Sequence, residues 1–229
     1  MKGKTLLIIV LVVLALVANP FRIYYARTAM EQGKIAYDQG DYDLAIARFT
    51  RAIKLNFWDK EEKADNLLWR GRAYYEKEEF NQALADFNKA IELRPNDFVC
   101  YLWRARTHEK MSNYDLAIAD FSKSIELDGG GRWNTYLERA HVYFINGDYV
   151  LEIADYDRAI SALDEIINSR DISSDRIDDL KKERNNIISD KRRTERLIEW
   201  RINNPEGNIV QWMILDLFTR GLEQLEGAR

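Results

Sequence analysis

The chain has 229 residues, of which 31% are charged, and its formal net charge is −4. This slightly acidic balance excludes a protein that attracts nucleic acid through a basic overall field. The single cysteine, Cys100, excludes an internal disulfide and a cysteine-rich zinc site. The length is sufficient for one domain or for an elongated array of smaller units.

The amino-terminal region carries an unbroken apolar run from Leu6 to Val17. At ~1.5 Å per residue this run spans only about 20 Å, less than the ~30 Å apolar core of a bilayer. A helix extended through residues 21–25 would be long enough, with Tyr24 and Tyr25 at the membrane interface. Because no good cleavage site follows the run, we expect residues 1–26 to form an uncleaved transmembrane signal anchor. A cleaved signal peptide is the alternative.

Basic residues flank this segment on both sides. Lys2 and Lys4 precede it, and Arg22 and Arg27 follow it, so the positive-inside rule favours a cytoplasmic amino terminus by a small margin. We therefore expect a single-pass membrane protein whose body is extracytoplasmic, in the periplasm. The alternative is that cleavage releases a soluble periplasmic or secreted protein.

Two stretches of the chain align with an offset of 34 residues. One begins LWRGRAYYEKEEF at Leu68, and the other begins LWRARTHEKMSNY at Leu102. Residues of the same kind fall on one another in this alignment: Gly71 on Ala105, Ala83 on Ala117, Phe87 on Phe121 and Ile91 on Ile125. A fixed period near this length indicates stacked supersecondary units.

The period, the small residue and the aromatic positions resemble the tetratricopeptide repeat (TPR) family. The resemblance implies an all-α fold, a TPR-type α-solenoid of antiparallel helix pairs over residues 27–168, with units of about 27–59, 64–97, 98–131 and 133–166. One small residue recurs where the two helices of a unit should meet: Gly33, Gly71, Ala105 and Ala140. In the fourth unit Glu152 replaces the alanine found at Ala45, Ala83 and Ala117, so we expect the stack to change character there.

The resemblance also implies that the first helix of each unit lines a concave groove that binds partner proteins. In each repeat, the residue directly after the small residue and the residue three positions further on share one helix face. These two positions carry mostly basic and aromatic residues. They are Lys34, Tyr37, Arg72, Tyr75, Arg106, His141 and Phe144, with Glu109 as the acidic exception. Because arginine forms bidentate hydrogen bonds, we expect this groove to bind an acidic segment or a carboxyl-terminal carboxylate. The carboxylate clamp of TPR co-chaperones differs in using asparagines here, and a merely solvated face is the alternative.

Other polar residues show no pattern that indicates chemistry. His108 and His141 are the only histidines, and neither lies at metal-ligand spacing from a cysteine or carboxylate. The sequence has no nucleophile elbow, triad or phosphate-binding loop. We expect no catalytic residues, no metal and no cofactor, and we assign Trp69 and Trp103 to packing between repeats.

The region 169–229 departs from the repeat. A helix-start signal at Ser173–Asp175 precedes a highly charged stretch, Arg176–Asn203, whose narrow apolar stripe suits a capping helix packed on one side. Residues 209–218 are apolar nearly all round and include Val210, Trp212, Met213 and Leu217. We expect this segment to fold back against the fourth unit. The alternative is docking into a partner or a second copy, which would make a homo-oligomer.

These patterns together predict a non-catalytic, membrane-anchored scaffold or adaptor that holds protein partners in a cell-envelope complex. One alternative is a cytosol-facing receptor or co-chaperone that captures acidic carboxyl-terminal tails. Another is a regulatory subunit of a membrane enzyme.

Overall fold

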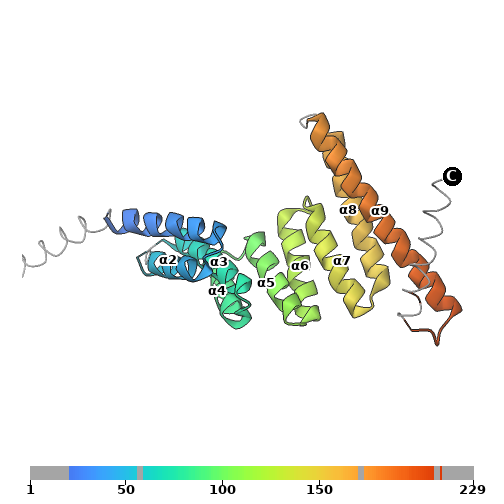
Figure 1. Cartoon of the computed structure of the whole chain (residues 1–229), viewed down its shortest axis with the longest axis horizontal. Coiled ribbons are helices and arrows are strands. Elements are labelled where there is room, and N and C mark those ends of the chain that lie inside the picture. Colours follow the sequence, from blue (N-terminus) through green and yellow to red (C-terminus); the bar gives the residue numbers. More distant parts are fainter. Residues whose placement is uncertain (1–20, 56–58, 170–172, 209–211, 213–229) are drawn as a thin grey trace, which may run out of the picture. The chain divides into compact units, whose positions relative to one another are not determined.

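The computed structural model describes residues 21–55, 59–169, 173–208 and 212. Within these ranges all regular structure is helical, which confirms the predicted all-α fold (Figure 1). A first helix covers residues 21–38. The others are α2 (Tyr42–Leu55), α3 (Lys60–Glu76), α4 (Phe80–Leu93), α5 (Phe98–Lys110), α6 (Tyr114–Asp128), α7 (Trp133–Asn146), α8 (Tyr149–Asn168) and α9 (Ser174–Asn203).

The chain divides into two compact units, Met1–Leu127 and Asp128–Arg229. In the first unit, α2 packs on α3, α3 on α4 and α4 on α5. In the second unit, α7 packs on α8 and α8 on α9. The division falls within residues 27–168, the range to which the sequence assigns a single array.

The first two helix pairs close on the small residue of their first helix. A Cβ atom added to Gly71 would lie 2.6 Å from Cε1 of Phe87, and one added to Gly33 would lie 2.7 Å from Cε1 of Phe49. Both rings are fully buried, as is Phe121 in α6. The residue at this position must therefore be small, because the aromatic ring of the second helix occupies the space that its side chain would need.

Ion pairs to buried aspartates join the two helices of three successive pairs. Arg70 donates from Nε and Nη2 to the two carboxylate oxygens of Asp86, both at 2.7 Å. Arg104 binds Asp120 in the same way at 2.7 and 2.6 Å, and Arg139 binds Asp155 at 2.7 and 2.7 Å. In each case the carboxylate lies 16 residues after the arginine. We call these three contacts the arginine–aspartate locks.

The turn inside each helix pair uses one left-handed residue, seven positions after the small residue. It is Gly40 (φ 77°), Glu78 (φ 60°), Ser112 (φ 59°) or Gly147 (φ 84°). Glycine adopts this conformation without a steric cost, whereas a residue with a Cβ atom does not. Two of the four turns are therefore strained.

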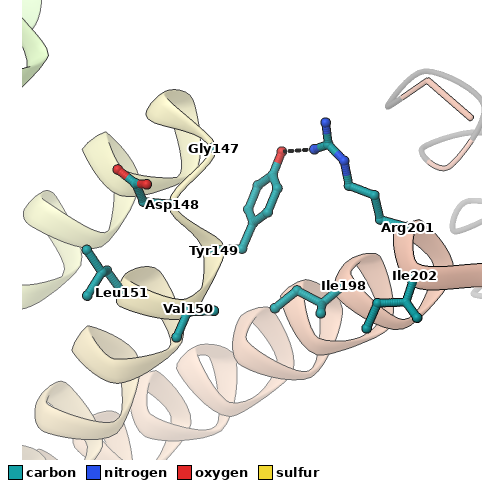
Figure 2. A pocket seen from close by; sticks show the side chains of 8 residues that line it. All are labelled: Gly147, Asp148, Tyr149, Val150, Leu151, Ile198, Arg201 and Ile202. Atoms are coloured by element: carbon teal, nitrogen blue, oxygen red, sulfur yellow. Dashed lines mark hydrogen bonds between the residues drawn. The ribbon is translucent and has the colours of Figure 1, made fainter. Parts of the chain in front are cut away.

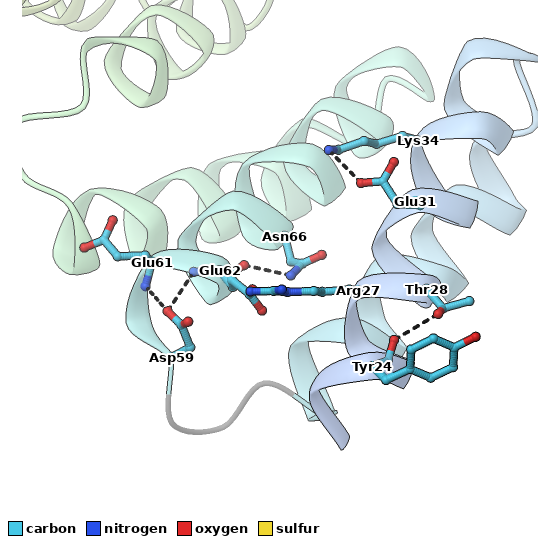
Figure 3. Close-up of polar contacts among 9 residues, drawn as sticks. All are labelled: Tyr24, Arg27, Thr28, Glu31, Lys34, Asp59, Glu61, Glu62 and Asn66. Atoms are coloured by element: carbon cyan, nitrogen blue, oxygen red, sulfur yellow. Dashed lines mark hydrogen bonds and ion pairs between the residues drawn. The ribbon is translucent and has the colours of Figure 1, made fainter. Parts of the chain in front are cut away.

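The predicted membrane anchor lies mostly outside the described residues, because residues 1–20 do. None of the helices that the structure describes is both long and apolar enough to cross a bilayer. The helix of residues 21–38 runs without a break across the expected boundary at residue 26 into the first repeat. Its Arg27 donates from Nε to Glu62 of α3 at 2.8 Å, and Asp59 caps the amino terminus of α3 (Figure 3).

The long helix α9 has the narrow buried stripe that its sequence indicates. Leu180, Ile187, Thr194 and Leu197 are its buried residues, and α9 packs on α8. Of the predicted docking residues, Val210, Met213 and Leu217 lie outside the described part of the chain. Trp212 is only 4% exposed, and the guanidinium carbon of Arg193 lies 5.4 Å from the centre of its ring. This ring therefore packs against its own chain.

Candidate protein-binding site

The first helices of the repeats in the first unit carry a continuous set of aromatic and basic side chains. We call Tyr37, Trp69, Arg72, Trp103 and Arg106 the aromatic–basic ladder. At its centre, the guanidinium carbon of Arg72 lies 4.0 Å from the ring centre of Trp69 and 4.7 Å from that of Trp103. Cation–π attraction operates at these distances, so two indole rings hold the guanidinium between them.

The remaining members extend this arrangement in both directions. Tyr37 meets Trp69 edge-on at 5.5 Å, and the guanidinium carbon of Arg106 lies 4.6 Å from the ring centre of Trp103. Two further predicted residues flank the ladder: Lys34, whose Nζ lies 5.8 Å from the ring centre of Trp69, and Tyr75, which meets Trp103 edge-on at 5.5 Å. The structure thus brings together five of the seven predicted groove residues.

Arg70 and Arg72 are two residues apart on α3 and have opposite surroundings. Arg70 is committed to its lock with Asp86. Arg72 forms no ion pair with any described residue, and its buried Nε atom has no hydrogen-bond acceptor there. Its guanidinium is therefore held by aromatic rings, and no carboxylate of the described residues lies within ion-pair distance of it.

Tyr37 completes the polar edge of the ladder. Its hydroxyl donates to Oε1 of Glu76 at 3.2 Å. Burial raises the pKa of Tyr37, and the positive charge of Arg72 opposes that rise. The hydroxyl therefore remains protonated at neutral pH, and its proton is donated to Glu76.

Trp69 and Trp103 are ladder members that the sequence reasoning assigned to packing alone. Trp69 does pack, because its ring stacks on Phe49 with 6.2 Å between centres. The signal for their second role was their position, three residues before Arg72 and Arg106, which places each indole on the same helix face as a guanidinium.

His141 and Phe144 belong to the second unit and line a cavity there, separate from the ladder. The cavity has a volume of about 250 Å³. Glu152 of α8 lies against it and is 2% exposed. The hydroxyls of Tyr156 and Thr194 each donate to Oε1 of Glu152 at 3.0 Å. The fourth repeat therefore differs from the other repeats at the position where its sequence differs, since Glu152 joins α8 to α9.

A second pocket, of about 400 Å³, lies between the start of α8 and the end of α9 (Figure 2). Val150 and Ile202 line it and are both 73% exposed. Arg201 donates from Nη1 to the hydroxyl of Tyr149 at 3.2 Å across its mouth. The lining is mainly apolar, and its polar side chains are Asp148, Tyr149 and Arg201.

Among the described residues, no three histidine, cysteine, aspartate or glutamate side chains lie close enough together to hold a metal ion. His108 lies inside the first unit, and burial lowers its pKa although Asp120 is 3.9 Å from its Nε2 atom. Cys100 is fully buried.

Two tetratricopeptide repeat families match the chain, one over residues 30–98 and the other over residues 87–119. Together the two matches cover residues 30–119, less than half of the chain. They support the predicted resemblance there, and residues 133–166 lie beyond the matched range. A comparison with curated proteins gives no match.

Solved structures share the repeat fold. MamA is 20% identical, with a TM-score of 0.58 over 63% of this chain and 81% of MamA. The first TPR of Spaghetti (RPAP3), solved with the HSP90 peptide SRMEEVD, is 21% identical, with a TM-score of 0.51 over 55% of this chain and 95% of that one. YrrB, described as a TPR protein with an unusual peptide-binding site, is 19% identical, with a TM-score of 0.52 over 60% of this chain and 68% of YrrB. These similarities establish a shared helical repeat fold.

Proposed function

We propose that this chain is a non-catalytic TPR scaffold whose aromatic–basic ladder binds an acidic segment of a partner protein. The observation that carries the proposal is Arg72, which two indole rings hold in place without a carboxylate from the described chain. A guanidinium fixed in this way loses little conformational entropy on binding, and its fork geometry matches a carboxylate. The HSP90 peptide that RPAP3 binds, SRMEEVD, contains three acidic residues, which is consistent with this chemistry in a TPR protein.

The ladder also explains why the binding should be selective. Trp69, Trp103 and Tyr37 provide apolar surface around the charge, so a partner must place an aliphatic or aromatic side chain beside its carboxylate. Arg106 adds a second guanidinium over Trp103, and Lys34, which pairs with Glu31 at 3.2 Å, adds an ammonium group near Trp69. A ligand with two or three acidic residues in an extended segment would therefore contact more than one basic group.

The test compares capture of partners by the full chain and two variants. Arg72→Gln combined with Arg106→Gln removes the charges of the ladder, and Arg51→Gln removes an exposed charge from α2 as the matched control. Wild type and the control should recover the same stoichiometric partner from detergent-solubilised membranes, and the double variant should lose it. Recovery should also weaken as salt concentration rises. A partner that binds the double variant as well as wild type would refute the ladder as its site.

We further propose that residues 1–26 anchor this scaffold in a membrane, with the repeats on the extracytoplasmic side in a cell-envelope complex. The apolar run Leu6–Val17 and the exposed aromatic residues Phe21, Tyr24 and Tyr25 that follow it support this proposal. Tyrosine favours the interface between lipid and water, which is where these side chains would then lie.

Membrane orientation can be tested with one introduced thiol. Asp148 is exposed, so Asp148→Cys in a Cys100→Ala background places a single accessible cysteine in the second unit. A membrane-impermeant thiol reagent should label it in intact cells if the repeats are extracytoplasmic. Labelling only after lysis would instead support a cytosol-facing receptor, and recovery in the soluble fraction would support a cleaved signal peptide.

A further inference from the structure

The cavity beside Glu152 is built from three helices and Trp212, all within the second unit. Its lining residues are His141 and Phe144 from α7, Glu152 and Tyr156 from α8, Asp190, Arg193, Thr194 and Leu197 from α9, and Trp212. At about 250 Å³ it is large enough for one long side chain or a small organic molecule. It does not involve the ladder, which lies in the other unit.

Glu152 lines this cavity and keeps one carboxylate oxygen without a hydrogen bond. Oε1 already accepts two hydrogen bonds, from Tyr156 and Thr194. Oε2 is buried, and no described residue donates to it. A buried carboxylate oxygen without a donor destabilises the fold. The equivalent position in the other repeats is an alanine, so the glutamate is not required for helix pairing.

Charges of both signs line the cavity beside Glu152. Asp190 adds a second carboxylate, and the guanidinium of Arg193 already lies 5.4 Å from the ring centre of Trp212, as a cation held by an aromatic ring. The rings of Phe144, Tyr156 and Trp212 give the cavity aromatic faces, which attract cations. A carboxylate oxygen beside aromatic faces is a suitable receptor for an ammonium or guanidinium group.

We propose that this cavity binds an organic cation, a guanidinium or ammonium group, which donates a hydrogen bond to Oε2 of Glu152. The cation can come from a lysine or arginine side chain of a protein partner or from a small free amine. Both sources offer the same donor, and the cavity accepts one such group at a time. The chain would then recognise acidic and basic chemistry in two separate units.

Calorimetric titration of the full chain with matched probes tests the charge requirement. The peptide acetyl-Gly-Arg-Gly-amide carries one guanidinium, and its citrulline counterpart has the same shape without the charge. The arginine peptide should bind, and the citrulline peptide should bind at least about tenfold more weakly. Equal binding of the two peptides, or no binding of the arginine peptide, would overturn the proposal. This comparison requires no variant.

Two variants then locate the site. Glu152→Gln keeps an oxygen that can accept from Tyr156 and Thr194 but removes the charge, and Glu165→Gln removes an exposed carboxylate from the same helix as a control. The arginine peptide should bind the control as it binds wild type and bind Glu152→Gln at least about tenfold more weakly. If Glu152→Gln does not fold, Glu152→Ala restores the residue of the other repeats. Binding unchanged by the loss of Glu152 would refute the assignment.

A second pair of small probes separates the two sources. Butylguanidinium is the free cation, and butylurea is its neutral counterpart. If butylguanidinium binds as tightly as the arginine peptide, the site accepts a free small molecule. If the peptide binds much more tightly, the flanking backbone contributes, and the ligand is a protein side chain. Both results require that butylurea fails to bind, and binding of butylurea would contradict the proposal.

Discussion

Removing one partner of an arginine–aspartate lock should destabilise the fold strongly. In Asp86→Ala, the guanidinium of Arg70 loses two hydrogen bonds of 2.7 Å and its only carboxylate among the described residues. Breaking a buried pair in this way costs roughly 3–5 kcal/mol, mostly because the remaining charge stays buried. The side chain of Arg70 is 17% exposed and that of Asp86 4%, so water can partly solvate the guanidinium. We expect a loss near the lower end, about 3 kcal/mol.

Urea unfolding followed by circular dichroism at 222 nm measures this loss as a shift in midpoint. A surface pair provides the control, because Lys77 lies 2.6 Å from Asp43, whose side chain is 82% exposed. Asp43→Ala should leave the midpoint unchanged within error. Replacing both lock residues, as Arg70→Met with Asp86→Leu, should restore stability to within about 1 kcal/mol of wild type. If Asp86→Ala behaves like Asp43→Ala, or if the double replacement is as damaging as Asp86→Ala, the reasoning is wrong.

Three further predictions concern single residues. Ser112 and Gly147 both have a left-handed backbone conformation, which glycine adopts most easily. In the same urea assay, Ser112→Gly should therefore stabilise the fold by roughly 0.5–1 kcal/mol, and Gly147→Ala should destabilise it by about 1 kcal/mol. Shifts of the opposite sign would contradict this reasoning. Burial raises the pKa of Cys100 to about 12, so Ellman's reagent at pH 8 should modify it only after unfolding, and rapid labelling of the native chain would show that the thiol is accessible. Burial also raises the pKa of Glu152 above its ordinary 4.5, with Asp190 acting in the same direction and Tyr156, Thr194 and His141 opposing. Wild type should therefore lose stability relative to Glu152→Gln as pH rises from 4 through the raised pKa, and a constant difference between the two midpoints would disprove the shift.

The helix pairs could be predicted because the sequence repeats the same physical requirement. Gly71 and Phe87 recur at a fixed offset as Ala105 and Phe121, and the ring of Phe87 leaves no room for a side chain at Gly71. The arginine–aspartate locks recur just as regularly. Apolar periodicity does not reveal them, because their residues are charged.

Other contacts of the candidate sites depend on how the helices pack, which the spacing of the sequence repeat does not specify. The position of Arg72 between Trp69 and Trp103 arises only when α3 and α5 stack at a particular spacing and rotation. Glu152 is visible in the sequence as a departure from alanine. Its partner Thr194 lies 42 residues later, in a helix outside the repeat pattern, so no alignment of repeats could identify it.

The regular spacing of the arginine–aspartate locks affects how helix pairs can be added to or removed from this chain by gene duplication or deletion. Arg70 also donates from Nη1 to Thr50 of the preceding pair at 2.9 Å, and Arg104 does the same to Asn88 at 2.7 Å. Thr50 and Asn88 occupy the same place, 17 residues after the small residues Gly33 and Gly71. A helix pair duplicated in frame would therefore arrive with its own arginine, its own aspartate and the acceptor that the next pair requires. Gene duplication could lengthen the first unit, or deletion shorten it, without leaving a buried charge unpaired.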